Sequence, residues 1–204
     1  MFMDRVARKK NEKYLSLITS AFELFEIKDF QSVSIDEIVK KAGVAKGTFY
    51  LYFNDKFDLI SKMIIKKATE YMDVEIDLPE ITDDMAFSQS VKNYTDLIVD
   101  FLEKNKTLTL LIDKNVHICV NTVIEHRDGA IKEMYDKIFS YFVGKGFSEE
   151  KVSTKLYLYA DLIVSSCCNA IIRSKPYTLE AVKPHLYDII TMSLYGVEKY
   201  RNNH

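Results

Sequence analysis

The stretch that decides the fold, residues 30–60, reads FQSVSIDEIVKKAGVAKGTFYLYFNDKFDLI. Ser34 with Glu37 three residues later forms a capping box, which predicts a helix that begins at Ser34. Gly43 can adopt the left-handed conformation of a sharp turn, so the helix is expected to end there. A second, short helix then covers about residues 45–52. A helix, a tight glycine turn and a short helix are the sequence form of a helix-turn-helix.

The short helix of residues 45–52 cannot be stable alone, so it must pack on its neighbours. Phe49 and Phe53, four residues apart, give it an inward face. Its outer side holds hydroxyls, one cation and little bulk, which suits the major groove of DNA. The residues that we expect at DNA are Ser34, Ala45, Lys46, Gly47, Thr48, Tyr50, Tyr52 and Lys56. Thr48 suits a base edge, whereas the serine, tyrosine and Lys56 side chains suit phosphates.

Upstream, apolar residues recur at helical spacing and predict a first helix that ends near Lys28. Its inward set is Tyr14, Leu17, Ile18, Ala21, Phe22 and Phe25. A short basic arm, with Arg5, Arg8, Lys9 and Lys10, is expected ahead of this helix. A fourth helix is predicted to begin near Asn54.

Downstream, long apolar patterns of helical period continue to the end of the chain. They predict helices over residues 85–104, 129–143, 149–173 and about 178–200, and a short apolar piece at 108–112. We find no convincing pair of strands, so we expect an all-α fold of about nine helices. An N-terminal three-helix helix-turn-helix domain of residues 1–54 would precede a helical ligand-binding and dimerisation domain of residues 55–204.

The quoted stretch resembles the DNA-binding domain of the TetR family of repressors. The matching elements are Ser34, Ile38, Ala42-Gly43-Val44, residues 46–50, Tyr52-Phe53 and Lys56. With the first helix the resemblance covers about 50 residues, and the rest matches only in helical layout. The departures are Val33, Ala45, Leu51 and Phe57. Ala45 is expected to leave the short helix without its usual N-cap, at a cost of about 1 kcal/mol. Leu51 is expected to remove one DNA contact.

The resemblance implies a sequence-specific transcriptional regulator that binds palindromic double-stranded DNA as a homodimer, and whose repression a small molecule relieves. The alternative is a constitutive architectural DNA-binding dimer that senses no ligand. In the family the last two long helices form a four-helix bundle with the partner. The interface residues expected on that basis are Leu156, Ile163, Cys167, Ile171, Leu186, Ile190 and Leu194. The apolar stripe of the last helix could instead be buried within one subunit.

An effector pocket is expected between residues 85–104, 128–143 and 149–173. Its candidate aromatic residues are Tyr94, Phe101, Tyr135, Phe139 and Tyr159, and its polar candidates are His117, Asn121 and Asp161. For each of these residues a core or surface role is the competing interpretation. So many aromatic side chains would suit a mostly apolar small molecule.

Charge and motifs narrow the class of protein. The net charge is −2, but residues 1–67 carry 13 Lys and Arg against 9 Asp and Glu, and the remaining residues 15 against 21. A basic N-terminal part followed by an acidic remainder is typical of a protein that contacts a polyanion with one end only. No nucleotide-binding, hydrolase or zincin motif occurs, so we expect no enzyme, no cofactor and no metal. Without a signal peptide or a long apolar run, a cytoplasmic protein without membrane contact is expected.

The three cysteines, Cys119, Cys167 and Cys168, have no metal-binding spacing. We interpret them as buried thiols of a reducing compartment, with a redox-sensing pair as the alternative.

Overall fold

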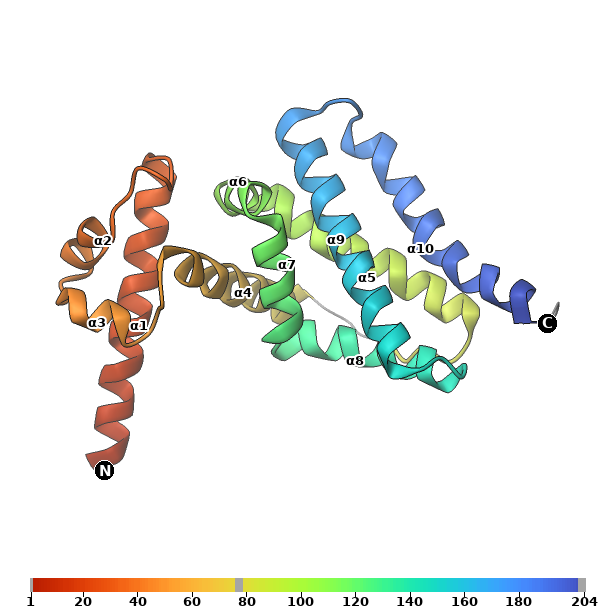
Figure 1. Cartoon of the computed structure of the whole chain (residues 1–204), viewed down its shortest axis with the longest axis horizontal. Coiled ribbons are helices and arrows are strands. Elements are labelled where there is room, and N and C mark those ends of the chain that lie inside the picture. The colour runs from red at the N-terminus through yellow and green to blue at the C-terminus, as the bar shows by residue number, and fades with distance from the viewer. Residues whose placement is uncertain (1, 76–78, 202–204) are drawn as a thin grey trace. The chain divides into compact units, whose positions relative to one another are not determined.

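The structure is a computed structural model that describes residues 2–75 and 79–201, and of residues 2–6, 75 and 194–201 the backbone only. Every regular element in the described part is a helix (Figure 1). The helices are α1 (Phe2–Ile27), α2 (Ile35–Ala42), α3 (Lys46–Tyr50), α4 (Lys56–Glu75), α5 (Asp84–Lys104), α6 (Lys106–Lys114), α7 (Val116–Glu125), α8 (Gly129–Gly144), α9 (Glu149–Arg173) and α10 (Leu179–Arg201). They form two compact units, residues 1–64 and 65–204, and the division falls within α4.

The first unit consists of α1, α2, α3 and the first turns of α4. It folds around apolar residues at helical spacing, because each of these short helices must bury one face. Its fully or nearly fully buried side chains include Leu17, Ala21, Val33, Ile38, Phe49, Phe53, Leu59 and Ile60. The hydroxyl of Ser16 on α1 donates to the carbonyl oxygen of Ala42 at 3.1 Å, which joins α1 to the last residue of α2.

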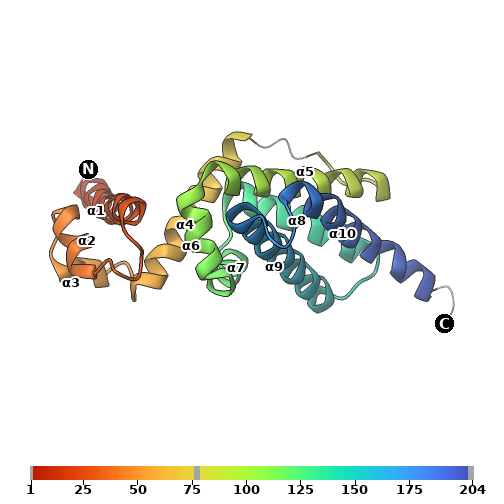
Figure 2. The ribbon, with the colours of Figure 1, turned by 90° about the horizontal axis from the view of Figure 1, so that it is seen from above.

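The second unit is built around α9, which contacts α5, α6, α7, α8 and α10 (Figure 2). By length and composition α9 could cross a membrane, as many core helices of folded proteins could. This finding qualifies the expectation that no segment is apolar enough to span a bilayer. Since α9 packs against five helices, we interpret it as the core helix of this unit.

The end of α4 is fastened to α8 inside the second unit. The backbone N–H of Ala130, in the first turn of α8, donates to Asp73 Oδ1 at 2.8 Å. Gly129 has φ +52°, and a Cβ at this position would lie 2.7 Å from Asp73 Oδ1 and 2.8 Å from Thr69 Cγ2. Glycine is therefore required at this junction by both its backbone conformation and its surroundings.

Several expectations about the elements need correction. Residues 5–10 lie within α1 rather than in an arm ahead of it. Helix α7 was not expected, whereas α10 begins at Leu179, close to the expected residue 178. The first turns of α4 pack with the first unit, because Leu59 and Ile60 are buried there, and the division between the compact units follows Ile64.

Candidate nucleic-acid interface

Helix α2 begins with the predicted capping box. The Ser34 hydroxyl accepts from the backbone N–H of Glu37 at 3.2 Å, and the Ser34 N–H donates to Glu37 Oε2 at 2.8 Å. Lys28 Nζ also donates to Glu37 Oε1 at 2.6 Å. The hydrogen bond from Lys28 and those from Ser34 lower the pKa of Glu37 to about 2. A charged carboxylate near the N-terminus of a helix also stabilises that helix, because the backbone N–H groups of its first turn carry partial positive charge.

The turn after α2 has the predicted geometry. Gly43 adopts φ +67° and ψ 32°, and its N–H bonds back to carbonyl oxygens of Lys40 and Val39. Ala45 stands at the N-cap of α3 with no side-chain hydrogen bond, as its methyl group requires. Two residues, Val44 and Ala45, separate the left-handed Gly43 from the first residue of α3. The turn between α2 and α3 is therefore short and sharp.

Helix α3 is held on its inner side by aromatic packing. Phe49 and Phe53 are 0% and 1% exposed, and their ring centroids lie 5.3 Å apart. Tyr14 of α1 stacks on Phe53 at 5.4 Å. A helix of five residues would not be stable in isolation, so this packing fixes its orientation.

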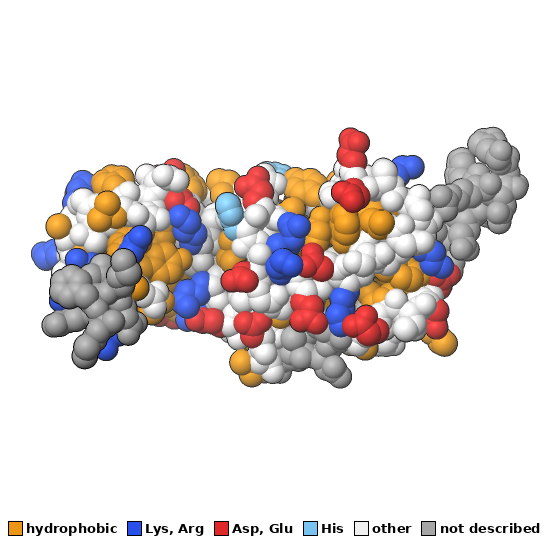
Figure 3. All heavy atoms as spheres, turned by 90° about the horizontal axis from the view of Figure 1, so that it is seen from below, with side chains coloured by type: hydrophobic (Ala, Val, Ile, Leu, Met, Phe, Trp, Pro, Cys, Tyr) orange, Lys and Arg blue, Asp and Glu red, His pale blue; other side chains and the backbone are white. Residues whose placement is uncertain are grey.

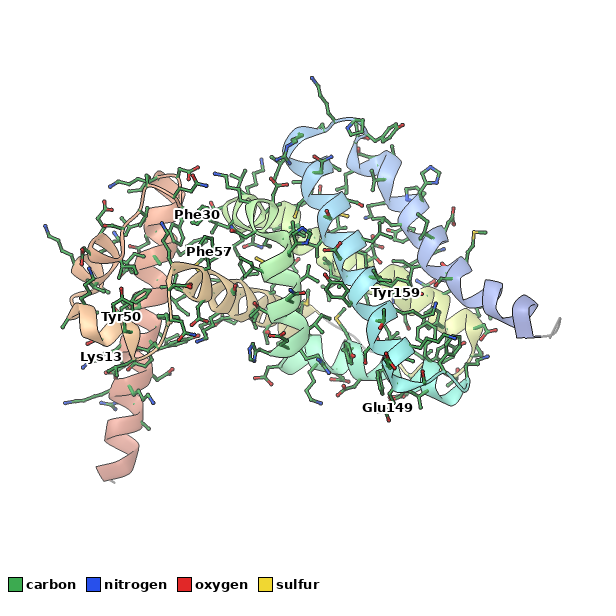
Figure 4. The ribbon with its side chains drawn as sticks, in the orientation of Figure 1. Lys13, Phe30, Tyr50, Phe57, Glu149 and Tyr159 are labelled. Atoms are coloured by element: carbon green, nitrogen blue, oxygen red, sulfur yellow. The ribbon has the colours of Figure 1, made fainter. Side chains whose placement is uncertain are left out.

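The opposite side of α3 faces solvent in the first unit. Tyr50 is 53% exposed and Leu51, at the C-cap, is 77% exposed. A Cβ added to Gly47 would meet nothing within 4 Å. Thr48 is half-buried beside them. The outer face thus offers an aromatic hydroxyl, aliphatic methyl groups and one position with no side chain, as Figure 4 shows for Tyr50.

Leu51 is a surface residue that the sequence did not lead us to expect at DNA. The resemblance suggested only that a contact is lost there, whereas the structure puts Leu51 four residues from Gly47, on the same exposed side. The signal that could have found it was the spacing of 47, 50 and 51 opposite Phe49 and Phe53.

The lysine of α3 has an acidic partner on α2. Lys46 Nζ lies 2.9 Å from Asp36 Oδ1 and 3.0 Å from Oδ2. The pair raises the pKa of Lys46, first through the hydrogen bond to Asp36. Both side chains are more than half exposed, so the pair is screened by solvent and can exchange partners.

Tyr52 has an internal hydrogen bond. Its hydroxyl donates to the backbone carbonyl of Lys10 at 2.9 Å, and its own carbonyl accepts from Lys62 Nζ at 2.9 Å. The side chain therefore joins the start of α1 to the segment after α3. A phosphate contact from Tyr52 would have to coexist with this bond or replace it.

Lys56 is turned into the first unit. Its ammonium donates to the carbonyl oxygens of Phe30, Gln31 and Val33 at 2.6, 3.3 and 2.7 Å. Desolvation lowers the pKa of this lysine. The ring of Phe57, the next residue, meets Phe30 edge to face at 5.8 Å (Figure 4). The ammonium of Lys56 thus binds the turn before α2. A phosphate contact, as expected from the sequence, would have to compete with these three hydrogen bonds.

The expected effector residues are distributed over several sites in the second unit. Tyr94 is buried in a cluster with Met72, Ala130 and Met134. Desolvation raises its pKa to about 12. Phe101 is also buried, 5.7 Å from the ring of Tyr71.

The remaining candidates lie elsewhere. Tyr135 and Phe139 stack on α8, with the Arg127 guanidinium 3.7 Å from the Tyr135 ring. The hydroxyl groups of Tyr159 and Ser193 form a hydrogen bond. His117 and Asn121 are exposed, and His117 Nδ1 lies 3.9 Å from Asp161 Oδ1. The eight residues thus lie among several different sets of neighbours.

The second unit has a surface groove of about 710 Å³ along α8 and residues 80–82. Lys137 lies between Glu80 and Glu133 there, at 3.2 and 3.6 Å. None of the eight expected effector residues lines this groove. Over the described ranges, 2–75 and 79–201, no group of three His, Cys, Asp or Glu side chains is placed to hold a metal ion.

The cysteines are buried free thiols. Burial raises the pKa of Cys119 and Cys168 to about 12 and that of Cys167 to about 11. These thiols are therefore protonated at neutral pH, which makes them poor nucleophiles.

Most of the expected interface residues are already buried within the protomer. The side chains of Leu156, Ile163, Cys167, Leu186 and Ile190 are 0–7% exposed. Ile171 is half-buried, and the Leu194 side chain lies outside the described residues. Among the described side chains of these helices, the large apolar residues that are exposed are Leu158 on α9 and Ile189 and Met192 on α10, at 55%, 52% and 68%. On the face of the molecule that Figure 3 shows, hydrophobic side chains lie between acidic and basic ones.

Comparison with known proteins gives a consistent result. Residues 17–63 match the model of bacterial regulatory proteins of the tetR family. A fatty acid metabolism regulator of Bacillus subtilis is 32% identical over 74 residues, which are 36% of this chain and 38% of that protein. An HTH-type transcriptional regulator of Staphylococcus aureus, SAB2452, is 24% identical over 83% of this chain and 87% of its own.

With four relatives of 32–39% identity, the matched segment spans only 34–49% of the relative. Among solved structures, the fatty acid degradation regulator FadR from Bacillus halodurans has a TM-score of 0.56 at 19% identity. That likeness covers 88% of this chain and 94% of the other, so the all-helical fold extends over both units.

Proposed function

We propose that this chain, whose residues 17–63 match the model of bacterial regulatory proteins of the tetR family, is a ligand-responsive transcriptional repressor that binds its operator specifically. The observation that carries the proposal is the exposed side of α3, where Gly47, Tyr50 and Leu51 lie opposite the buried Phe49 and Phe53. A short helix whose inner side is fixed by packing and whose outer side is exposed can enter the major groove of DNA.

The roles of individual residues follow from their exposure. Thr48 and Tyr50 on α3 can reach base edges or phosphates, and Gly47 lets the backbone approach the duplex closely. Lys46 can leave Asp36 for a phosphate, since both partners are solvent-exposed. Ser34 and Ala45 lie at the starts of α2 and α3, where backbone N–H groups can bind phosphate oxygens.

We further propose that the active species is a two-fold dimer in the cytoplasm, without membrane contact. Two recognition helices must reach half-sites about 34 Å apart or a multiple of this, which one copy of α3 cannot do. The occupant of the exposed apolar side of α9 and α10 would be a second copy of the chain. Leu158, Ile189 and Met192 would then become buried between the two copies.

The effector is proposed to bind the second unit near Tyr94. Met72 and Met134 there can adapt their shape to an apolar molecule, because methionine is flexible and polarizable. The buried hydroxyls of Thr69 and Thr95 have no hydrogen-bond partner among the described residues, and a ligand's polar groups could satisfy them. The relative named for fatty acid metabolism matches about a third of this chain, so its name does not identify the effector.

The test is a thermal-shift screen of the full chain, followed by measurement of each stabilising compound's affinity with and without operator DNA. An inducer should bind DNA-free protein more tightly, by a factor on the order of 5 to 150, and DNA affinity must fall by the same factor. If every tight ligand binds equally with and without DNA, the chain is a constitutive DNA-binding dimer. That outcome would remove the sensor function and leave the helix-turn-helix.

A further inference from the structure

The outer face of α3 differs in chemistry from a surface that reads guanine. Guanine is most often read by the paired donors of Arg or by Lys. Helix α3 has one cation, Lys46, at its first position, and both oxygens of Asp36 lie within 3.0 Å of that ammonium. A carboxylate at this place would also repel the electronegative guanine edge. Whether Lys46 stays with Asp36 or moves to a phosphate, the positions Gly47, Tyr50 and Leu51 offer guanine no cation.

Leu51 is the most apolar group on that face. It is 77% exposed and continues the helical backbone of α3 with φ −75° and ψ −19°. Gly47, one turn earlier, has no side chain that could hold a base edge away from it. Single exposed leucines are common on protein surfaces, so exposure alone carries no weight. Its place beside Gly47 and Tyr50 sets it apart.

Only one base presents an apolar group in the major groove of unmodified DNA, namely thymine with its C5 methyl. We propose that Leu51 is a specificity-determining residue that reads a thymine in each half-site by packing against this methyl group. The inference rests on the proposed function, since it assigns a base to the face that enters the groove. It reverses the expectation that Leu51 merely removes a contact.

The test begins with duplexes that the full-length wild-type protein selects from a random library. Each thymine of the selected sequence is then replaced by deoxyuridine, which removes only the C5 methyl. At one position per half-site, the wild type should lose affinity by about fourfold, the worth of one buried methyl-sized group. Leu51→Ala should bind the thymine duplex about as weakly and lose the distinction between thymine and uracil.

Two further variants make the result specific. Leu51→Met keeps an apolar side chain and should retain most of the thymine preference. Ile27→Ala removes a side chain of the same unit that is 73% exposed, and it should leave the preference unchanged. Melting temperatures equal to that of the wild type show that the variants fold.

The outcomes separate the two proposals. If a sequence is selected but no uracil replacement matters, or if Leu51→Ala keeps the thymine preference, this inference is overturned while the repressor function stands. A uniform loss of affinity for all duplexes in Leu51→Ala would mean that Leu51 contacts the backbone, which also overturns it. If the wild type selects no sequence, both proposals fail.

Discussion

The ammonium of Lys56 donates a hydrogen bond to the carbonyl oxygen of Phe30 at 2.6 Å and lies 5.1 Å from the centroid of the Phe30 ring. One side chain thus holds both the backbone and the ring of the residue that opens the turn before α2. The bonds to Gln31 and Val33 complete the arrangement. Lys56 therefore positions the capped start of α2 from the first turn of α4.

Lys56→Met should destabilise the first unit without removing a phosphate contact. The three carbonyl oxygens lose their donor, so we expect the free energy of unfolding to fall by about 1–3 kcal/mol. The salt dependence of operator binding should keep its slope. As a matched control, Lys46→Met should lower the slope by about 0.9 if Lys46 contacts one phosphate. A slope that falls equally in both variants would return Lys56 to the phosphate role.

Gly47→Ala should separate stability from DNA binding. A Cβ at Gly47 meets nothing within the protein, and alanine in a helix is favoured over glycine by about 1 kcal/mol. The variant should melt at a higher temperature yet bind the operator more weakly, because the methyl group holds the backbone away from the duplex. Gly43→Ala is the contrasting variant, since φ is +67° there and the protein itself should be destabilised. Unchanged operator affinity in Gly47→Ala would show that this position does not approach DNA.

Glu37 should make the stability of the first unit depend on pH in the acid range. Its pKa is lowered to about 2 in the folded chain, from an ordinary value of 4.5. A lowered folded-state pKa stabilises the fold above the unfolded-state value, and this stabilisation is lost as the pH falls from about 4.5 to 2. Glu37→Gln, measured by urea unfolding, should therefore lose less stability than the wild type over that range.

Lys28 provides the check on the cause of this shift. The hydrogen bond from Lys28 is the largest contribution to the lowered pKa of Glu37. Lys28→Met should accordingly flatten the acid-range stability profile towards that of Glu37→Gln. If both variants follow the wild-type profile, the capping box does not account for the pH dependence.

Aspartate substitutions on α9 should distinguish the core from the proposed subunit interface. Ile163 is 7% exposed, so Ile163→Asp buries an unpaired charge and should unfold the second unit. Leu158 is 55% exposed, so Leu158→Asp should keep the melting transition but yield monomers in size-exclusion chromatography with light scattering. Met85→Asp, at a position of α5 that is 78% exposed, is the control and should remain dimeric. A dimeric Leu158→Asp would argue against this face.

Local signals allowed the DNA-binding part of the chain to be predicted in detail. Ser34 with Glu37, and Gly43, specify their conformations through nearest neighbours along the chain, and the structure confirms each of them. The inward positions of Phe49 and Phe53 followed from their spacing and are also confirmed. Here local sequence and tertiary packing favour the same structure.

The sequence was less informative where partners are distant along the chain. The bond of Lys56 spans 26 residues, so a lysine in a first helical turn gave no indication of it. On α9 the resemblance assigned Ile163 to the subunit interface, whereas the structure buries Ile163 within the protomer and exposes Leu158. The eight effector candidates were chosen by residue type, which says nothing about whether their side chains meet.

The central claim, that the exposed side of α3 reads a DNA sequence, is tested most directly by fluorescence anisotropy of the full chain. The selected duplex and a scrambled duplex of the same composition are titrated at one fixed salt concentration. The selected duplex should bind at least about 10³-fold more tightly, and Tyr50→Ala should lower this ratio of affinities. Equal affinities for the two duplexes at that salt concentration would contradict the central claim.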